Sequence, residues 1–164
     1  MLTNMFKKTK YATIPVKTIE KAVAKQDSEN GRLNSNQRLE LICDENTFIP
    51  MFENVKTLNP LSFEGYEEKI SSLCEKTGFS EAVKTGECEI FGTKTCIAVM
   101  DSEFLMGSMG SVVGERLSRL FEYAEANTLP VIIFCASGGA RMHEGIFSLM
   151  QMAKVSAAVQ KHSQ

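Results

Sequence analysis

The feature that most constrains the fold is an apolar run that leads directly into two adjacent glycines. Residues 129–136, LPVIIFCA, are apolar at consecutive positions, which is typical of a β-strand covered on both faces. We therefore expect a strand over Leu129–Cys135. The two glycines lie in Ser137–Ala140, and a helix is expected to start at once after them and to run near Glu144–His162. This order of elements indicates an α/β fold.

Two glycines at a strand-to-helix turn have a physical consequence. Without a Cβ, their backbone N–H groups can converge on a ligand, and a following helix adds the positive end of its dipole. Such a turn suits a phosphate or a developing oxyanion. Arg141 could add charge there or brace the turn. The alternative is a tight turn whose glycines only permit close packing of the helix on the strand.

The preceding segment shows the same pattern. A hairpin is predicted around Gly92, with strands over Ala82–Ile90 and Lys94–Asp101. Residues 107–111, GSMGS, precede a predicted helix over Val112–Asn127. Four of its apolar residues recur at helical spacing and are expected to face a core, namely Val113, Leu117, Leu120 and Ala124. A strand, a glycine turn and a helix therefore occur twice, which indicates parallel crossovers.

The N-terminal third is less regular. Residues 1–35 are predicted to form a weakly structured arm, which includes a polar run over residues 20–35. A short helix is predicted from Asn36, followed by a loop that stops near Pro50. An amphipathic helix is predicted within residues 62–78, with Gly78 as its C-cap and with Ile70, Leu73 and Cys74 at helical spacing. Because a crossover unit normally continues into another strand, the chain is expected to be cut short after its last helix.

Composition excludes several classes of protein. A formal net charge of −2 over 164 residues argues against a general nucleic-acid binder. No apolar run approaches the roughly 20 residues of a membrane span, and the N-terminus lacks the apolar core of a signal peptide, so a cytoplasmic location is expected. The five cysteines are odd in number and form no CxxC pair, and the two histidines add no ligand spacing. Reduced thiols are therefore expected, and no metal site is.

Familiar catalytic motifs are absent from the sequence. No G-x-S-x-G surrounds Ser108, Ser111 or Ser137, so there is no nucleophile elbow. No GxxxxGK[ST] occurs, which excludes a P-loop. MGSMGSVVG lacks the GxGxxG spacing of a dinucleotide fold.

Two long runs carry a resemblance to a known family. They are MDSEFLMGSMGSVVGERLSRLFEYA, residues 100–124, and LPVIIFCASGGARMHEGIFSLMQMAKVSAA, residues 129–158. With NPLSFEGYEEKI and TGFSEAVKTGECEI before them, they resemble the β subunit of bacterial acetyl-CoA carboxylase carboxyltransferase over roughly residues 36–160. The resemblance implies that residues 36–164 are a partial carboxyltransferase domain. Its expected fold is the N-terminal part of the crotonase-like (ClpP/crotonase) β–β–α spiral.

The resemblance also implies a reaction. The family transfers a carboxyl group from carboxybiotin, held on the biotin carboxyl carrier protein, to acetyl-CoA and forms malonyl-CoA, the first committed step of fatty acid synthesis. The implied partners are the carboxyltransferase α subunit, the carrier protein and biotin carboxylase, in an ATP-dependent complex. Gly138 and Gly139 are implied as the catalytic donors to the thioester oxygen. The implied base is the ureido group of biotin, which this chain does not bind.

Further residues are implied to bind the substrate. The GSMGS loop, defined as Gly107, Ser108, Met109, Gly110 and Ser111, would shape the acyl-CoA pocket together with Ala140 and Arg141. The alternative is a packing loop in which Ser111 caps the next helix. His143 stands where the family commonly has Gln. It could be a general base, but a polar turn residue is the preferred interpretation.

Two departures from the family leave alternatives open. The family usually has a four-cysteine zinc ribbon before the helix that is predicted here from Asn36, and this ribbon is missing. The family's fold also continues well beyond residue 164. The chain could therefore be a non-catalytic fragment or interaction module, and little or no activity is expected of it alone. An unrelated crotonase-type CoA hydrolase or isomerase is disfavoured by SMGSVVGE and SLMQMAK.

Overall fold

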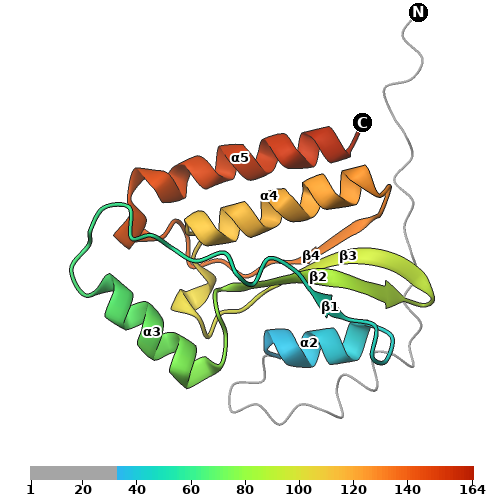
Figure 1. Ribbon diagram of the computed structural model, residues 1–164, viewed down its shortest axis with the longest axis horizontal. Coiled ribbons are helices and arrows are strands. Elements are labelled where there is room, and N and C mark those ends of the chain that lie inside the picture. The colour runs from blue at the N-terminus through green and yellow to red at the C-terminus, as the bar shows by residue number, and fades with distance from the viewer. Residues whose placement is uncertain (1–32) are drawn as a thin grey trace, which may run out of the picture. The chain divides into compact units, whose positions relative to one another are not determined.

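A four-stranded sheet organises residues 33–164, the part of the chain that the computed structural model describes (Figure 1). The strands lie in the order β1 (Ile49–Pro50), β2 (Val83–Ile90), β3 (Thr93–Met100) and β4 (Val131–Phe134). Strands β1 and β2 pair antiparallel, as do β2 and β3, whereas β4 is parallel to β3. The predicted arm, residues 1–35, lies outside the described residues except for its last three.

The hairpin between β2 and β3 confirms the prediction around Gly92, with strand ends shifted by one residue. The strands pair without interruption from Val83↔Met100 to Ile90↔Thr93. Phe91 and Gly92 form the two-residue turn and have φ values of 50° and 70°. Positive φ at both positions is what the twist of a short hairpin requires. The Asp44 carboxylate accepts hydrogen bonds from both turn amides, at 3.2 and 2.7 Å.

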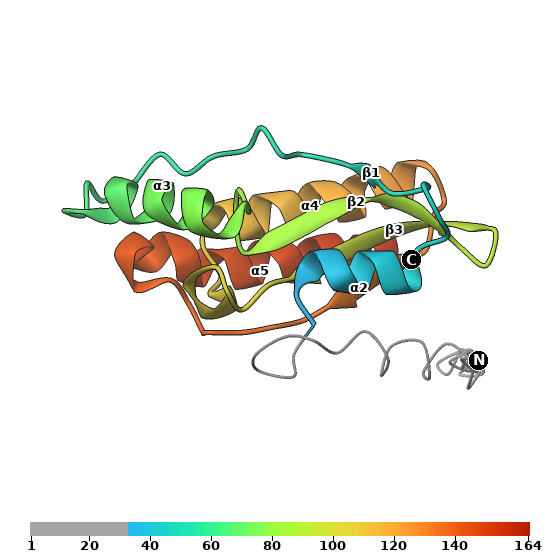
Figure 2. The same ribbon diagram turned by 90° about the horizontal axis from the view of Figure 1, so that it is seen from below.

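Helices cover the two faces of the sheet. Helix α4 (Ser111–Ala126) packs on one face, where Val113, Leu117, Leu120 and Ala124 are at most 4% exposed, as predicted. The opposite face is covered by α2 (Ser35–Ile42), whose Leu39 packs with Cys88, Ile97 and Val99. Helix α5 (Ile146–His162) runs alongside α4 (Figures 1 and 2). Successive side chains of β2 and β3 point to opposite faces of the sheet, so the apolar ones contribute to two separate cores, one under α4 and one under α2.

The crossover from β3 through α4 to β4 confirms the predicted parallel connection. Cys96↔Val131 and Val99↔Phe134 mark the ends of the parallel register. The prediction of a strand covered on both faces was wrong for the described residues. Within residues 33–164, β4 is an edge strand that pairs with β3 alone, and Ile132 is 36% exposed.

The predicted amphipathic helix is α3 (Tyr66–Thr77), which lies at the end of the sheet away from the hairpin turn (Figure 1). Gly78 has φ 70° and its N–H donates to the Cys74 carbonyl, so it is the C-cap that the sequence predicted. The two-residue strand β1 was missed because Pro50 indicates a loop. Gly86 allows this strand to approach, since a Cβ there would lie 2.5 Å from the Ile49 carbonyl oxygen.

No helix among residues 33–164 has both the length and the apolar character that crossing a bilayer would require.

Candidate functional site

The glycine turn, defined as residues 137–140, leaves the end of β4 and is largely exposed. Its two glycines are required for different reasons. Gly139 has φ 81°, in the left-handed region that favours glycine. Gly138 lies against the chain at Met106, because a Cβ there would be 2.9 Å from the Met106 carbonyl oxygen. A side chain at either position would therefore strain or displace the turn.

The amides of the glycine turn are accessible donors. The Gly139 N–H donates to the Ser137 hydroxyl oxygen over 3.2 Å, a long hydrogen bond within the turn. Among residues 33–164, no acceptor lies within hydrogen-bonding range of the Gly138 N–H. The Gly138 N–H is therefore a backbone donor without an acceptor in the described residues, in a turn that is largely exposed, while binding of an anionic oxygen there stays a prediction.

The structure joins the glycine turn to the GSMGS loop. The Met109 N–H donates to the Gly139 carbonyl at 2.9 Å, and the Arg141 N–H donates to the Met109 carbonyl at 2.9 Å. These two bonds form a parallel bridge between Met109 and Ala140. The two segments that the sequence nominated separately thus form one local structure, and a shift of the loop must shift the turn.

A left-handed stretch at the start of the GSMGS loop lies against the glycine turn. Leu105, Met106 and Gly107 have φ values of 45°, 57° and 72°. Left-handed conformations at non-glycine residues cost of order 1–3 kcal/mol each and often occur at functional sites. Met106 is also 72% exposed beside Gly138. Only Gly107 indicated an irregular backbone here, so the sequence did not predict this stretch.

Arg141 braces the turn from inside the protein. Its guanidinium is buried and pairs with both Glu81 carboxylate oxygens, at 2.9 and 2.5 Å. The other donors bind the hydroxyl and carbonyl oxygens of Ser108, at 3.3 and 2.9 Å, and the Tyr66 hydroxyl at 3.2 Å. All five N–H groups are therefore engaged within the chain. Of the two roles considered for Arg141, bracing is the one that this geometry supports.

Charge and shape both lock Arg141 in place. Burial by itself would lower the pKa of the guanidinium, but the Glu81 carboxylate beside it raises the pKa above its usual value. The guanidinium also fills the space above Gly110, where a Cβ would lie 2.7 Å from one of its nitrogens. The glycine at position 110 therefore makes room for the buried cation.

The helix expected at once after the glycines starts later. A 3₁₀ turn, η2 (Met142–Glu144), comes first, and α5 begins at Ile146. The cause is twofold: Ala140 is extended in the bridge to Met109, and Gly145 has a non-helical φ of 50°. The predicted support of the glycine turn by the dipole of a directly following helix was therefore wrong.

The capping role considered for Ser111 is performed differently. Gly110 is the N-cap of α4 and supplies no side-chain hydrogen bond, while Ser111 is the first helical residue. The Ser111 N–H donates instead to the Glu144 carboxylate at 2.5 Å. A carboxylate from 33 residues further along the chain thus occupies the positive end of α4.

His143 lies in the 3₁₀ turn η2 and packs in an aromatic group. Its ring stacks on Tyr66 with 4.9 Å between ring centroids and contacts the edge of Phe63 at the same separation. Burial lowers the pKa of His143, and the charges of Lys69 and Arg141 lower it further. The neutral ring that results is suited to stacking.

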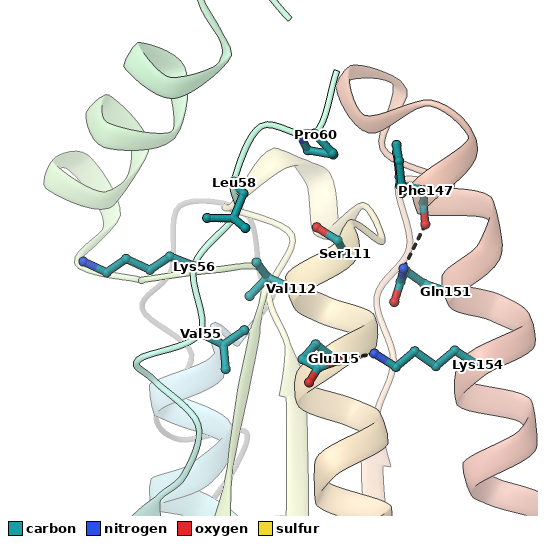
Figure 3. A pocket seen from close by; sticks show the side chains of 10 residues that line it. All are labelled: Val55, Lys56, Leu58, Pro60, Ser111, Val112, Glu115, Phe147, Gln151 and Lys154. Atoms are coloured by element: carbon teal, nitrogen blue, oxygen red, sulfur yellow. Dashed lines mark hydrogen bonds and ion pairs between the residues drawn. The ribbon is translucent and has the colours of Figure 1, made fainter. Parts of the chain in front are cut away.

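A pocket of about 280 Å³ opens beside the start of α4 (Figure 3). Ser111 is the predicted substrate-binding residue that lines it. Residues 55–60 and α5 form its other sides, and Figure 3 shows the ion pair between Lys154 and Glu115 at its rim. Its apolar lining consists of Val55, Leu58, Pro60, Val112 and Phe147. The GSMGS loop therefore borders an open pocket at its helical end.

Within residues 33–164, no group of three or more histidine, cysteine or acidic side chains is arranged to hold a metal ion. All five cysteines of the chain lie in this range and are free thiols.

Comparisons with known proteins agree with the sequence resemblance. Residues 26–164 match the carboxyl transferase domain family. A relative from Lachnospira eligens, acetyl-coenzyme A carboxylase carboxyl transferase subunit beta 1, is 54% identical over 136 residues, which are 83% of this chain and 53% of that protein. The chain thus spans about half the length of this relative.

Solved structures show the same fold. Transcarboxylase 12S, solved with methylmalonyl-coenzyme A and methylmalonic acid bound, matches with a TM-score of 0.66 and 25% identity over 87% of this chain and 25% of that one. The β subunit of geranyl-CoA carboxylase from P. aeruginosa matches with a TM-score of 0.58 and 22% identity over 87% of this chain and 24% of that one. The mixed α/β fold is thus the crotonase-like carboxyltransferase fold, in part. The chain belongs to the carboxyl transferase domain family, as a partial homologue of the acetyl-CoA carboxylase carboxyltransferase β subunit.

Proposed function

We propose that this chain provides the acyl-CoA side of an acetyl-CoA carboxyltransferase, in which the glycine turn binds the thioester oxygen. The observation that carries the proposal is the exposed glycine turn, held by the bridge between Met109 and Ala140, in which the Gly138 N–H has no acceptor among residues 33–164 and the Gly139 N–H makes a long bond to the Ser137 hydroxyl. Backbone donors already in place cost no reorganisation during the reaction, and each is worth about 2.7–4 kcal/mol by analogy with other oxyanion holes.

The proposed reaction converts acetyl-CoA to malonyl-CoA. Removal of a proton from the α-carbon of the thioester leaves negative charge on its oxygen, and the two amides stabilise that charge. Biotin, brought by its carrier protein, would supply the carboxyl group and the base. The chain's own contribution is to bind and orient the thioester, with the GSMGS loop and its neighbouring pocket on the acyl-CoA side. In this proposal the chain holds neither biotin nor zinc.

The proposed partners are those of the complete enzyme: the α subunit, the biotin carboxyl carrier protein and biotin carboxylase, in the cytoplasm. The apolar residues that α5 leaves exposed support an assembly of this kind. A non-catalytic interaction module is the second candidate, and the same exposed face favours it.

The Gly139→Val substitution tests the proposed function. A hybrid in which residues 36–164 replace the matching segment of the Lachnospira eligens β subunit would be assayed with its α subunit for malonyl-CoA formation from carboxybiotin. Valine at φ 81° is expected to distort the turn and to lower turnover at least about 100-fold, the effect of losing one oxyanion donor.

Gly92→Val is the matched control. Gly92 has φ 70° and, like Gly139, has open space where a Cβ would lie, but it belongs to the hairpin turn. The control should incur the same backbone strain and keep most of its turnover. Full activity of Gly139→Val would contradict the role of the turn. An inactive hybrid that carries no substitution would favour the interaction module.

A further inference from the structure

Three buried side chains lie behind the glycine turn and bring together segments far apart in the sequence. Tyr66, at the start of α3, and Glu144, in η2, have no exposed surface, and Arg141 is 1% exposed. We call these three residues the polar cluster. They are separated by 75 and 78 residues along the chain, counted from Tyr66. Buried polar groups are costly unless they are paired, so the contacts within the cluster decide how it holds together.

The Tyr66 hydroxyl is the central atom of the polar cluster. It accepts a hydrogen bond from Arg141 Nη1 at 3.2 Å and donates one to Glu144 Oε1 at 2.7 Å. The guanidinium and the carboxylate are themselves 3.8 Å apart, beyond hydrogen-bonding range. The phenol therefore links the two charged groups where they do not bond directly.

Each charged group then holds one end of the GSMGS loop. Arg141 donates to the side chain and the carbonyl of Ser108 in the GSMGS loop. Glu144 accepts from the Ser111 N–H at the end of the same loop and from the Thr57 hydroxyl at 3.2 Å. Because the loop is bridged to the turn through Met109, the position of the turn depends on both groups.

The protonation states fix the direction of these bonds. Burial and the hydrogen bond to Glu144 raise the pKa of Tyr66 to about 12. Burial alone would raise the pKa of Glu144, but hydrogen bonds from Tyr66 and Ser111, with the Arg141 charge, bring it below its usual value. At neutral pH the phenol is thus a fixed donor to a charged carboxylate. Arg141 and His143 are the other titratable groups that act on this carboxylate or lie beside it.

We propose that Tyr66 is a positioning residue for the glycine turn: its hydroxyl couples Arg141 to Glu144, and through them it sets where the Gly138 and Gly139 amides lie. The inference rests on the proposed function for its catalytic consequence. Its structural part concerns this chain alone and can fail separately.

The Tyr66→Phe substitution removes one oxygen and keeps the ring that stacks on His143. In the full 164-residue chain, hydrogen exchange followed by mass spectrometry should become at least about tenfold faster at the amides of Met109, Ser111 and Arg141, whose bonds hold the loop and the turn. Exchange in the β2–β3 hairpin should not change. Uniformly faster exchange throughout would show general destabilisation and would overturn the inference.

Tyr123→Phe is the matched control, since Tyr123, on α4, donates its hydroxyl to Glu87 at 2.8 Å and not to a member of the polar cluster. It should leave the three amides unchanged. Should Tyr66→Phe not fold, Thr57→Val removes a partner of Glu144 at the edge of the cluster and should accelerate exchange at Ser111 about threefold. Unchanged exchange at Ser111 in that variant would overturn the inference.

The pH dependence separates positioning from packing. Without the phenol, Glu144 loses a bond that lowers its pKa, so it should protonate at a higher pH in Tyr66→Phe. As the pH is lowered, exchange at Met109, Ser111 and Arg141 should therefore begin to accelerate at a higher pH in Tyr66→Phe than in the parent chain. A packing defect would leave the pH of this onset unchanged. In the hybrid enzyme, kcat should fall about tenfold with KM within twofold. An inactive parent hybrid would defeat the proposed function, while the exchange result would still decide the role of Tyr66.

Discussion

Helices α4 and α5 have nearly the same length, 16 and 17 residues, yet differ sharply in burial. Nine residues of α4 are buried, whereas Ser148 is the one buried residue among those described in α5. Helix α4 lies between the sheet and α5, so neighbours cover most of its circumference (Figure 1). Helix α5 packs mainly on α4. The apolar residues of α4 are thus removed from solvent because the sheet and α5 cover them, whereas most of those of α5 have no covering element among residues 33–164.

The largest expected effect is on stability. Leu120 of α4 is fully buried, and Leu120→Ala should lower the free energy of unfolding by about 2–5 kcal/mol, because it removes packed methyl groups and leaves a cavity. Met150 of α5 is 58% exposed, and Met150→Ala should cost less than about 1 kcal/mol. Urea titrations of both variants measure the difference. Equal losses would mean that α5 is as well covered as α4.

A second effect concerns association. The exposed apolar residues of α5 are Ile146, Phe147, Leu149, Met150, Met152 and Val159. Such a surface favours association, so the chain alone should self-associate or be poorly soluble, and Met150→Gln with Met152→Gln should shift it toward the monomer. Sedimentation velocity measures this. Phe91→Asn, at the 69% exposed hairpin turn, is the control and should have no effect. A parent chain that sediments as a monodisperse monomer and unfolds cooperatively would contradict the prediction.

The smallest effect is at the contact between the two helices. Hydrogen bonds from Lys154 and, secondarily, Arg119 lower the pKa of Glu115 below its usual 4.5. Glu115→Gln should cost about 0.5 kcal/mol at neutral pH, because all three side chains are partly exposed and solvent screens them. A lowered pKa gives stability that is lost as the pH falls through that pKa. The difference between parent and variant should therefore vanish in acid, and a constant difference would exclude the ion pair as its cause.

The sequence predicted those parts of the fold that depend on local patterns. Val113, Leu117, Leu120 and Ala124 were identified from helical spacing, and the hairpin from Gly92, because each signal lies within a few residues. The bounds predicted for the last helix agree with α5 within two residues, but the extended stretch between the glycines and that helix was not predicted, because the bridge between Met109 and Ala140 joins residues 31 positions apart.

The candidate site was predicted in part for the same reason. Gly138 and Gly139 could be nominated from the strand before them, and the role of the turn itself stays a prediction. Tyr66 and Glu81 gave no signal, since their partner Arg141 lies 75 and 60 residues away. A charged residue near a glycine turn can face a ligand or the core, and only the position of a distant carboxylate decides between the two.

The hairpin turn has a consequence for the selectivity of the glycine turn. At Phe91 and Gly92, two consecutive amides around a left-handed glycine hold the carboxylate of Asp44, so the chain carries its own tethered anion there. At Gly138 and Gly139 no side-chain carboxylate of residues 33–164 takes that place. A tethered carboxylate competes with free anions for the hairpin turn, whereas at the glycine turn the Gly138 N–H has no acceptor in the described residues and the Gly139 N–H makes only a long bond to the Ser137 hydroxyl. Under the proposed function, discrimination between a thioester and a dissolved carboxylate then has to come from residues around the turn, and Met106, which is 72% exposed and whose backbone lies against Gly138, is one of them.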